Sequence, residues 1–122
     1  MSDTIPVGEG LNSLYSVMVW VKLEREEEWL EWMKGHHVQA VVDQPGFYCV
    51  TMTHLTTGPA VQEGVSAYRM DYWAENMAAI DAYVAGPAKQ LKQDLVDAFG
   101  SDARAERVLG NCVATFLNQA IS

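Results

Sequence analysis

His37 is the residue of this chain whose type and position most clearly suggest chemistry, because it lies within a segment, 24–42, that has the periodicity of a helix. At about 100° per residue, Trp29 and Met33 fall on one apolar face of this helix and His37 falls near the middle of that face. Since an imidazole titrates close to neutral pH, burial and neighbouring groups can adapt it to acid–base catalysis. We therefore take His37 as a candidate general acid or base. The alternative is a neutral structural imidazole that is hydrogen-bonded to the backbone or to a partner subunit.

Arg69 and Asp71 form a second candidate pair, since they stand two residues apart in a strand-like segment, 65–73, and share one of its faces. Charges that face inward on a sheet are costly unless they are paired or used. In a functional arrangement Asp71 orients His37 or acts as a base itself, and Arg69 stabilises an anionic enolate, as removal of a proton next to a carbonyl requires. The alternative is an exposed ion pair or a bridge at a subunit interface.

The candidate substrate-binding residues are mostly aromatic. Tyr68 and Tyr72 lie on the face of segment 65–73 opposite to the charged pair. Tyr48 and His54 belong to the strand-like segment before it, and Trp20 to the first one. Together with Arg69 these side chains would line a pocket for an apolar small molecule. The alternatives are an ordinary aromatic core and, for His54, a solvated position beside a loop.

The sequence carries no motif for a cofactor or a metal. It has neither a glycine-rich phosphate loop nor a nucleophile elbow. His36 and His37 would point about 100° apart on a helix, and neither has a second histidine three or four residues away. Cys49 and Cys112 are far apart and match no disulfide framework or zinc site. We therefore expect no metal and no cofactor.

Length and charge restrict the possible partners. The chain has 122 residues, enough for one domain with a real core. Its 16 acidic and 8 basic residues give a formal net charge of −8, which repels phosphate backbones and anionic lipid headgroups. Its start lacks the apolar core of a signal peptide, and apolar runs long enough to span a membrane are absent. We expect a cytoplasmic protein that binds neither nucleic acid nor membranes.

Hydrophobic periodicity predicts a polar N-terminal arm, 1–13, and one domain, 14–122. Within the domain we expect a strand at 14–23, a helix at 24–42, strands at 47–55 and 65–73 joined by a hairpin loop at 56–64, a helical stripe at 77–99 broken at Gly86-Pro87, and a last strand at 104–118. Right-handed crossovers then place the helices on one face of a four-stranded antiparallel sheet in the order 4-1-3-2, an α+β ferredoxin-like βαββαβ fold.

One face of that sheet would lack a helix layer. Val17 and Val19 point to one side of the first strand, while Met18 and Trp20 point to the other, so neither side has the pattern of a water-facing surface. Because an exposed apolar sheet face needs a cover, we expect a homodimer that packs sheet against sheet.

Three runs resemble a known group of proteins: EEEWLEWMKGHHVQAVV at 26–42, MDYWAENMAAIDAYV at 70–84 and FGSDARAERVL at 99–109. They are similar to a small bacterial family of domains of unknown function within the dimeric α+β barrel superfamily of ferredoxin-like folds. The resemblance covers about residues 15–110, and it departs from the family pattern at Asp71, where the family has glutamine. The superfamily contains antibiotic-biosynthesis monooxygenases, polyketide cyclases, lactone isomerases, haem-degrading enzymes and non-enzymatic members, so the resemblance implies a fold and a dimer more than a reaction.

Three functions therefore stay open. The first is a small cofactor-free enzyme that transfers a proton on an apolar, carbonyl-bearing or aromatic molecule, as an isomerase, cyclase or lyase. The second is a cofactor-independent monooxygenase that uses the same substrate anion to reduce dioxygen. The third is a non-catalytic ligand-binding or dimerisation module. An open cavity reached by His37 and a tyrosine or carboxylate would favour an enzyme, and a packed interior with His37 bonded to backbone would favour the module.

Overall fold

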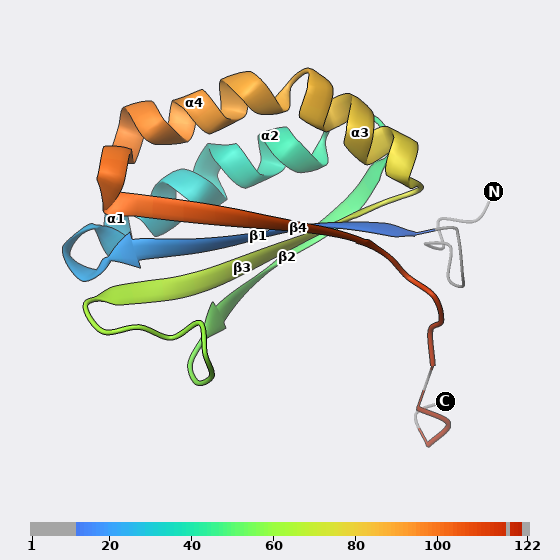
Figure 1. Cartoon of the computed structure of the whole chain (residues 1–122), viewed down its shortest axis with the longest axis horizontal. Helices are drawn as coiled ribbons and strands as arrows, with labels where there is room; N and C mark the ends of the chain where they lie inside the picture. The colour runs from blue at the N-terminus through green and yellow to red at the C-terminus, as the bar shows by residue number, and fades with distance from the viewer. Residues whose placement is uncertain (1–11, 117, 121–122) are drawn as a thin grey trace.

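The computed structural model describes residues 12–116 and 118–120 and consists of one antiparallel sheet with helices on one of its faces (Figure 1). The strands are β1 (Ser13–Lys22), β2 (Phe47–Leu55), β3 (Val65–Ala74) and β4 (Ala103–Asn111). Their order in the sheet is β2-β3-β1-β4. This is the ferredoxin-like order expected from the sequence, with β1 and β3 at the centre.

The helix layer is divided into short pieces. The first crossover contains α1 (Glu26–Trp32), a π-helical turn (Met33–His37) and α2 (Val38–Val42), and the second contains α3 (Met77–Ala85) and α4 (Ala88–Phe99). Short 3₁₀ turns at Leu23–Arg25 and Gly100–Asp102 join the helices to the sheet. The helix expected at 24–42 begins at Glu26, after a 3₁₀ turn, and ends at Val42 as expected, and the stripe at 77–99 is two helices.

The core lies between the sheet and the helices. Residues of β1 alternate, so that Tyr15, Val17 and Val19 face the helices and are buried. The register of β1 with β3 places Tyr72, Met70 and Tyr68 beside them in that order, on the same face. Helical residues at intervals of three and four complete the core: Trp29 and Met33, Ile80 and Tyr83, and Leu95 and Phe99.

The last strand is shorter than expected. We predicted a strand over 104–118, but β4 ends at Asn111, and residues 112–116 run on without strand structure, away from the sheet (Figure 1). The reason is the length of its neighbour: β4 is an edge strand that pairs with β1, and Asn111 is already opposite Ser13, the first residue of β1. One further backbone bond, from the Cys112 N–H to the Asn12 carbonyl, ends the pairing.

The face of the sheet away from the helices is the open face, and it is partly apolar. Leu14 and Met18 of β1 are half-buried there, and Val108 of β4 has 61% of its surface exposed. The Trp20 indole also lies on this face, where the Ala60 carbonyl accepts a 2.7 Å hydrogen bond from Nε1 and the Arg104 guanidinium lies 4.0 Å from the ring centroid. Trp20 is 6% exposed, so its ring is already buried within one chain.

Candidate functional site

The π-helical turn positions His37. In this turn the Val38 N–H donates to the Met33 carbonyl, five residues earlier, instead of four. The wider turn keeps both His37 and Val38 on the buried side, in line with Met33. Single π-turns inside α-helices recur at functional sites, and this one contains the histidine that the sequence singled out.

The His37 imidazole is buried and incompletely bonded. It is 9% exposed and stacks on Trp32, with ring centroids 4.7 Å apart and an interplanar angle of 21°. Its Nδ1 is buried and finds no hydrogen-bond partner among the protein atoms of the described residues. Burial lowers the pKa of His37, Asp94 opposes this effect, and His36 and Arg107 add to it. The ring is therefore neutral at pH 7, with one nitrogen left to water or a ligand.

The imidazole borders a small, partly enclosed void of about 20 Å³ between the sheet and the helices. This volume has room for about one water molecule. The polar groups on its wall come from five elements besides the π-helical turn: Tyr15 of β1, Tyr72 of β3, Tyr83 of α3, Lys92 of α4 and Arg107 of β4. The void is thus the place where the polar groups of the core converge.

Three of these groups are phenols packed against one another. The rings of Tyr15 and Tyr72 lie 5.9 Å apart, and those of Tyr15 and Tyr83 meet edge to face at 5.4 Å. Burial raises the pKa of Tyr72 and of Tyr83, although the nearby Arg107 cation acts in the opposite direction. Both phenols therefore keep their protons at neutral pH and can donate hydrogen bonds into the void.

Arg107 is the functional candidate that the sequence analysis missed. Its Nε donates a 3.0 Å hydrogen bond to the Tyr15 hydroxyl, and it forms no ion pair with any carboxylate in the described part of the chain. Strand alternation contained the signal: Ala103, Ala105 and Arg107 share a face, and two alanines are typical of a strand covered by a helix. That pattern would have predicted an arginine facing the core.

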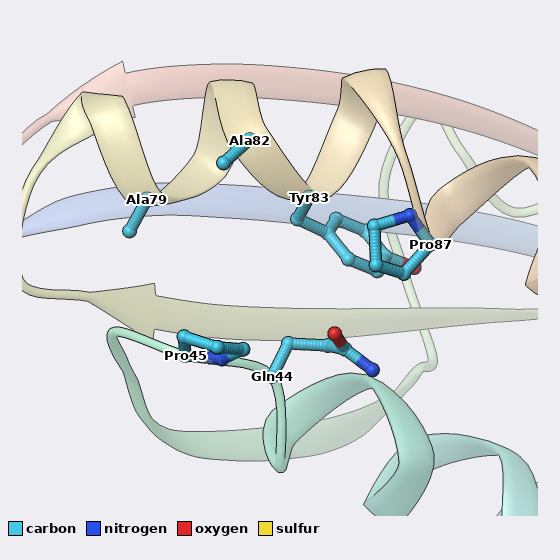
Figure 2. A pocket seen from close by; sticks show the side chains of 6 residues that line it. All are labelled: Gln44, Pro45, Ala79, Ala82, Tyr83 and Pro87. Carbon is cyan, nitrogen blue, oxygen red and sulfur yellow. The ribbon is translucent and has the colours of Figure 1, made fainter.

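A second cavity opens beside the void. It is a cleft of about 260 Å³ between the turn after α2 and the helix α3, lined by Gln44, Pro45, Ala79, Ala82, Tyr83 and Pro87 (Figure 2). Figure 2 shows Gln44 and Pro45 on one side and the α3 side chains on the other. Tyr83 lines both the cleft and the void, so its ring stands between them.

Of the residues expected to complete the His37 site, the structure brings Tyr72 to the void and leaves Tyr68 outside it. The Tyr68 ring lies between Trp29, at 4.9 Å, and His54, at 4.6 Å, and its hydroxyl donates a 2.5 Å hydrogen bond to Glu26. His54 is exposed and stacks on Tyr68. These side chains form a separate aromatic stack.

The structure does not bring Asp71 to His37. Asp71 and Arg69 lie on the open face, where Asp71 Oδ1 accepts hydrogen bonds from Ser16 Oγ at 2.7 Å and Arg69 Nε at 2.8 Å. The two sides of a strand alternate, so Asp71 and Tyr72 cannot both face the same helix. Within one chain, the expected convergence of His37 and Asp71 is therefore absent.

The other two expected binding residues also lie outside the void. Trp20 is on the open face, beside Arg104. Tyr48 is the extra residue of a bulge in β2, between Phe47 and Cys49, and is half-buried away from both cavities. Within residues 12–116 and 118–120 there is no group of three His, Cys, Asp or Glu side chains that could hold a metal ion. None of the described helices is long and apolar enough to cross a membrane.

Comparison with known proteins identifies a family and a fold. A family described as a domain of unknown function, DUF4286, matches residues 12–109. No curated protein matches the chain significantly. Among solved structures, a dimeric ferredoxin-like protein from an uncultured marine organism is similar over 87% of this chain and 99% of its own, with 13% identity and a TM-score of 0.61.

Two further structures share the fold. An inferred antibiotic biosynthesis monooxygenase from Bacillus cereus is 13% identical, covers 89% of this chain and 100% of its own, and has a TM-score of 0.59. A protein of the ethyl tert-butyl ether D (EthD) family from Bacillus halodurans is 13% identical over 80% of this chain and 96% of its own, with a TM-score of 0.57. At such identities the likeness concerns the fold alone.

Proposed function

We propose a function from the chain's own residues, because the chain belongs to DUF4286, a family of domains of unknown function. In this proposal the protein is a small enzyme that needs no cofactor and transfers a proton on an apolar, carbonyl-bearing or aromatic molecule. The observation that carries the proposal is the convergence of His37, buried phenols and Arg107 on one void that adjoins an apolar cleft.

His37 is the proposed base. With its proton on Nε2, the neutral imidazole offers the lone pair of Nδ1, which has no partner in the described chain. The ring accepts a proton from the carbon next to a carbonyl, and the electron pair of the broken C–H bond moves into an enolate. The same imidazolium then returns the proton to another atom of the substrate, as an isomerisation or lyase reaction requires.

The phenols and Arg107 are the proposed stabilisers of the enolate oxygen. Tyr72 and Tyr83 stay protonated because burial raises their pKa, so they donate hydrogen bonds to a developing negative charge. Arg107 adds a fixed positive charge on the same void. In this account Tyr72 keeps the binding role expected from the sequence, whereas Asp71 has no role at His37.

The open face is the proposed subunit interface. Its apolar groups, such as the half-buried Met18 and the exposed Val108, would be covered by a second copy, and the Arg69–Asp71 pair would lie at that interface. The likeness to a dimeric ferredoxin-like protein supports this arrangement. We therefore propose a homodimer whose two void sites face away from the interface.

A second candidate function is a cofactor-independent monooxygenase, which the likeness to an inferred antibiotic biosynthesis monooxygenase favours. The same base and the same substrate anion would be used, with the anion passing electrons to dioxygen. Consumption of dioxygen in step with substrate distinguishes this reaction from isomerisation.

The experiment uses 2-tetralone, an apolar aromatic ketone, as a probe for removal of a proton next to a carbonyl. Proton NMR in D₂O follows exchange of its α-hydrogens, and an oxygen electrode monitors dioxygen in parallel. The wild-type protein should accelerate exchange, and His37→Asn should lower this acceleration by about 10²–10⁴-fold. His36→Asn is the matched control, since His36 is adjacent and exposed. Equal exchange by the folded His37→Asn and wild-type proteins would favour a non-catalytic module instead.

A further inference from the structure

Arg107 has more hydrogen-bonding capacity than the protein uses. A guanidinium carries five N–H donors in a planar fork. In the described chain Arg107 makes one hydrogen bond, through Nε, to the Tyr15 hydroxyl. Its two terminal nitrogens make no hydrogen bond in the described chain, and Arg107 lines the void. A guanidinium with these nitrogens unused can bind a carboxylate through two parallel hydrogen bonds.

Lys92 adds a second positive charge at the same place. It is half-buried on α4 and lines the void together with Arg107, and it forms no ion pair in the part of the chain that the structure describes. Two like charges around a partly buried void repel each other and lose hydration. An anion between them would relieve both costs.

The surroundings of this cation pair contain little compensating negative charge. Asp94 is the carboxylate whose charge acts on His37, and its half-buried side chain accepts a 2.8 Å hydrogen bond from Gln90. The void therefore has two cations against one carboxylate nearby, although the whole chain has a formal charge of −8. The positive charge at the void is therefore opposite in sign to the net charge of the protein, and it favours an anionic ligand at this place.

The adjoining cleft indicates what the anion is attached to. Its lining is mostly apolar, with two prolines, two alanines and the Tyr83 ring. A cavity of about 150 Å³ is enough to bind benzene, so about 260 Å³ accommodates a single ring with a short side chain. The void itself has room for about one small polar group. Rotation of Tyr83, which lines both spaces, would join them.

We propose that the ligand of this site is a ring-bearing organic carboxylate, with its carboxylate held by Arg107 and Lys92 and its ring in the cleft beside Tyr83. This inference rests on the proposed small-molecule site and names its ligand class. The tyrosine hydroxyls then donate the hydrogen bonds to the enolate oxygen, and Arg107 contributes its positive charge beside that oxygen while its terminal nitrogens hold the carboxylate.

The test compares phenylacetate with phenylacetamide, two probes of almost equal shape that differ in charge. Isothermal titration calorimetry at pH 8 should show phenylacetate binding to the wild-type protein roughly tenfold or more tightly than phenylacetamide. Arg107→Gln and Lys92→Gln should each reduce this preference, and Arg107→Gln should abolish it. The matched controls are Arg104→Gln, on the other face of β4, and Lys89→Gln, on the exposed side of α4. Both controls should retain the preference.

The outcomes separate the two proposals. Equal binding of both probes to the wild-type protein, or an unchanged preference in Arg107→Gln, would overturn the carboxylate assignment and leave the cleft as a site for neutral molecules. Loss of preference in the controls as well would show that net charge governs binding, and would also overturn it. Failure of both probes to bind would count against the small-molecule site itself. Should Arg107→Gln lose its circular dichroism melting transition, Lys92→Gln alone decides the question.

Discussion

Replacing His37 with leucine should make the protein more stable, because the imidazole occupies a buried position without completing its hydrogen bonds. A buried polar group that gains no protein partner costs about 1–3 kcal/mol. The variant also loses the Trp32 stack, which is worth about 0.5–1.5 kcal/mol. We therefore expect a net gain of about 1 kcal/mol in the free energy of unfolding, and a rise of about 3–6 °C in Tm.

The gain should also depend on pH. Burial lowers the pKa of His37 in the folded state below its ordinary value of 6.5, so the unfolded chain binds more protons than the folded one as the pH falls through 6.5. Protonation of this residue therefore destabilises the wild-type protein below pH 6.5 and leaves it unaffected at pH 8. Since leucine has no such proton, the advantage of His37→Leu should be larger at pH 5 than at pH 8.

Urea denaturation of both proteins at the two pH values measures these differences. His36→Leu serves as the control, because His36 is exposed and a surface change of this kind alters stability by no more than about 0.5 kcal/mol. A loss of stability of about 1 kcal/mol or more in His37→Leu at pH 8 would refute the reasoning, since it would mean that the ring makes a hydrogen bond that stabilises the fold.

Three more predictions follow from the packing. Gly46→Ala should destabilise the protein by about 2–4 kcal/mol in urea denaturation, because the φ of Gly46 is 87° and an added Cβ would lie 2.5 Å from Ala79 Cβ. Gly35→Ala should instead stabilise the protein by about 0.5–1 kcal/mol, because Gly35 is helical and an added Cβ there would meet open space. Equal effects of the two changes would contradict this prediction. Tyr68→Phe should lower stability by about 1 kcal/mol without changing 2-tetralone exchange, and Tyr72→Phe should slow that exchange; the reverse pattern would move the site to Tyr68. Met18→Lys should halve the mass found by light scattering if the open face joins two copies, and an unchanged dimer would place the interface elsewhere.

Much of the fold could be predicted because its determinants are local. Alternation along β1 and the right-handed crossover rule led to the sheet order, and Gly86-Pro87 marked the boundary between α3 and α4. The end of β4 could not be read in this way, because it depends on where β1 begins. The π-helical turn also has no clear signature, since Gly35 is compatible with an ordinary helix.

The site was predictable in part. Periodicity alone placed His37 on the buried face, and strand alternation placed Tyr72 on the side of the helices. The same alternation argues against Asp71 as a partner of His37, and along β4 it places Arg107 on the side that faces the helices. The cleft arises from the packing of α3 against the turn after α2, and the void arises from the packing of the helices on the sheet. Such long-range spacing is not encoded in any local pattern.

Nitrogen NMR of the histidine rings can show whether a small molecule binds at His37, as proposed. The chain has three histidines, which can be assigned with His36→Asn and His54→Asn variants. On titration with phenylacetate, the account predicts a saturable shift of the His37 ring signals while those of His36 and His54 stay in place, and a loss of this shift when Ala82→Trp fills the cleft. Saturable binding that leaves the His37 signals unchanged, or that persists in Ala82→Trp, would mean that the ligand does not bind at His37.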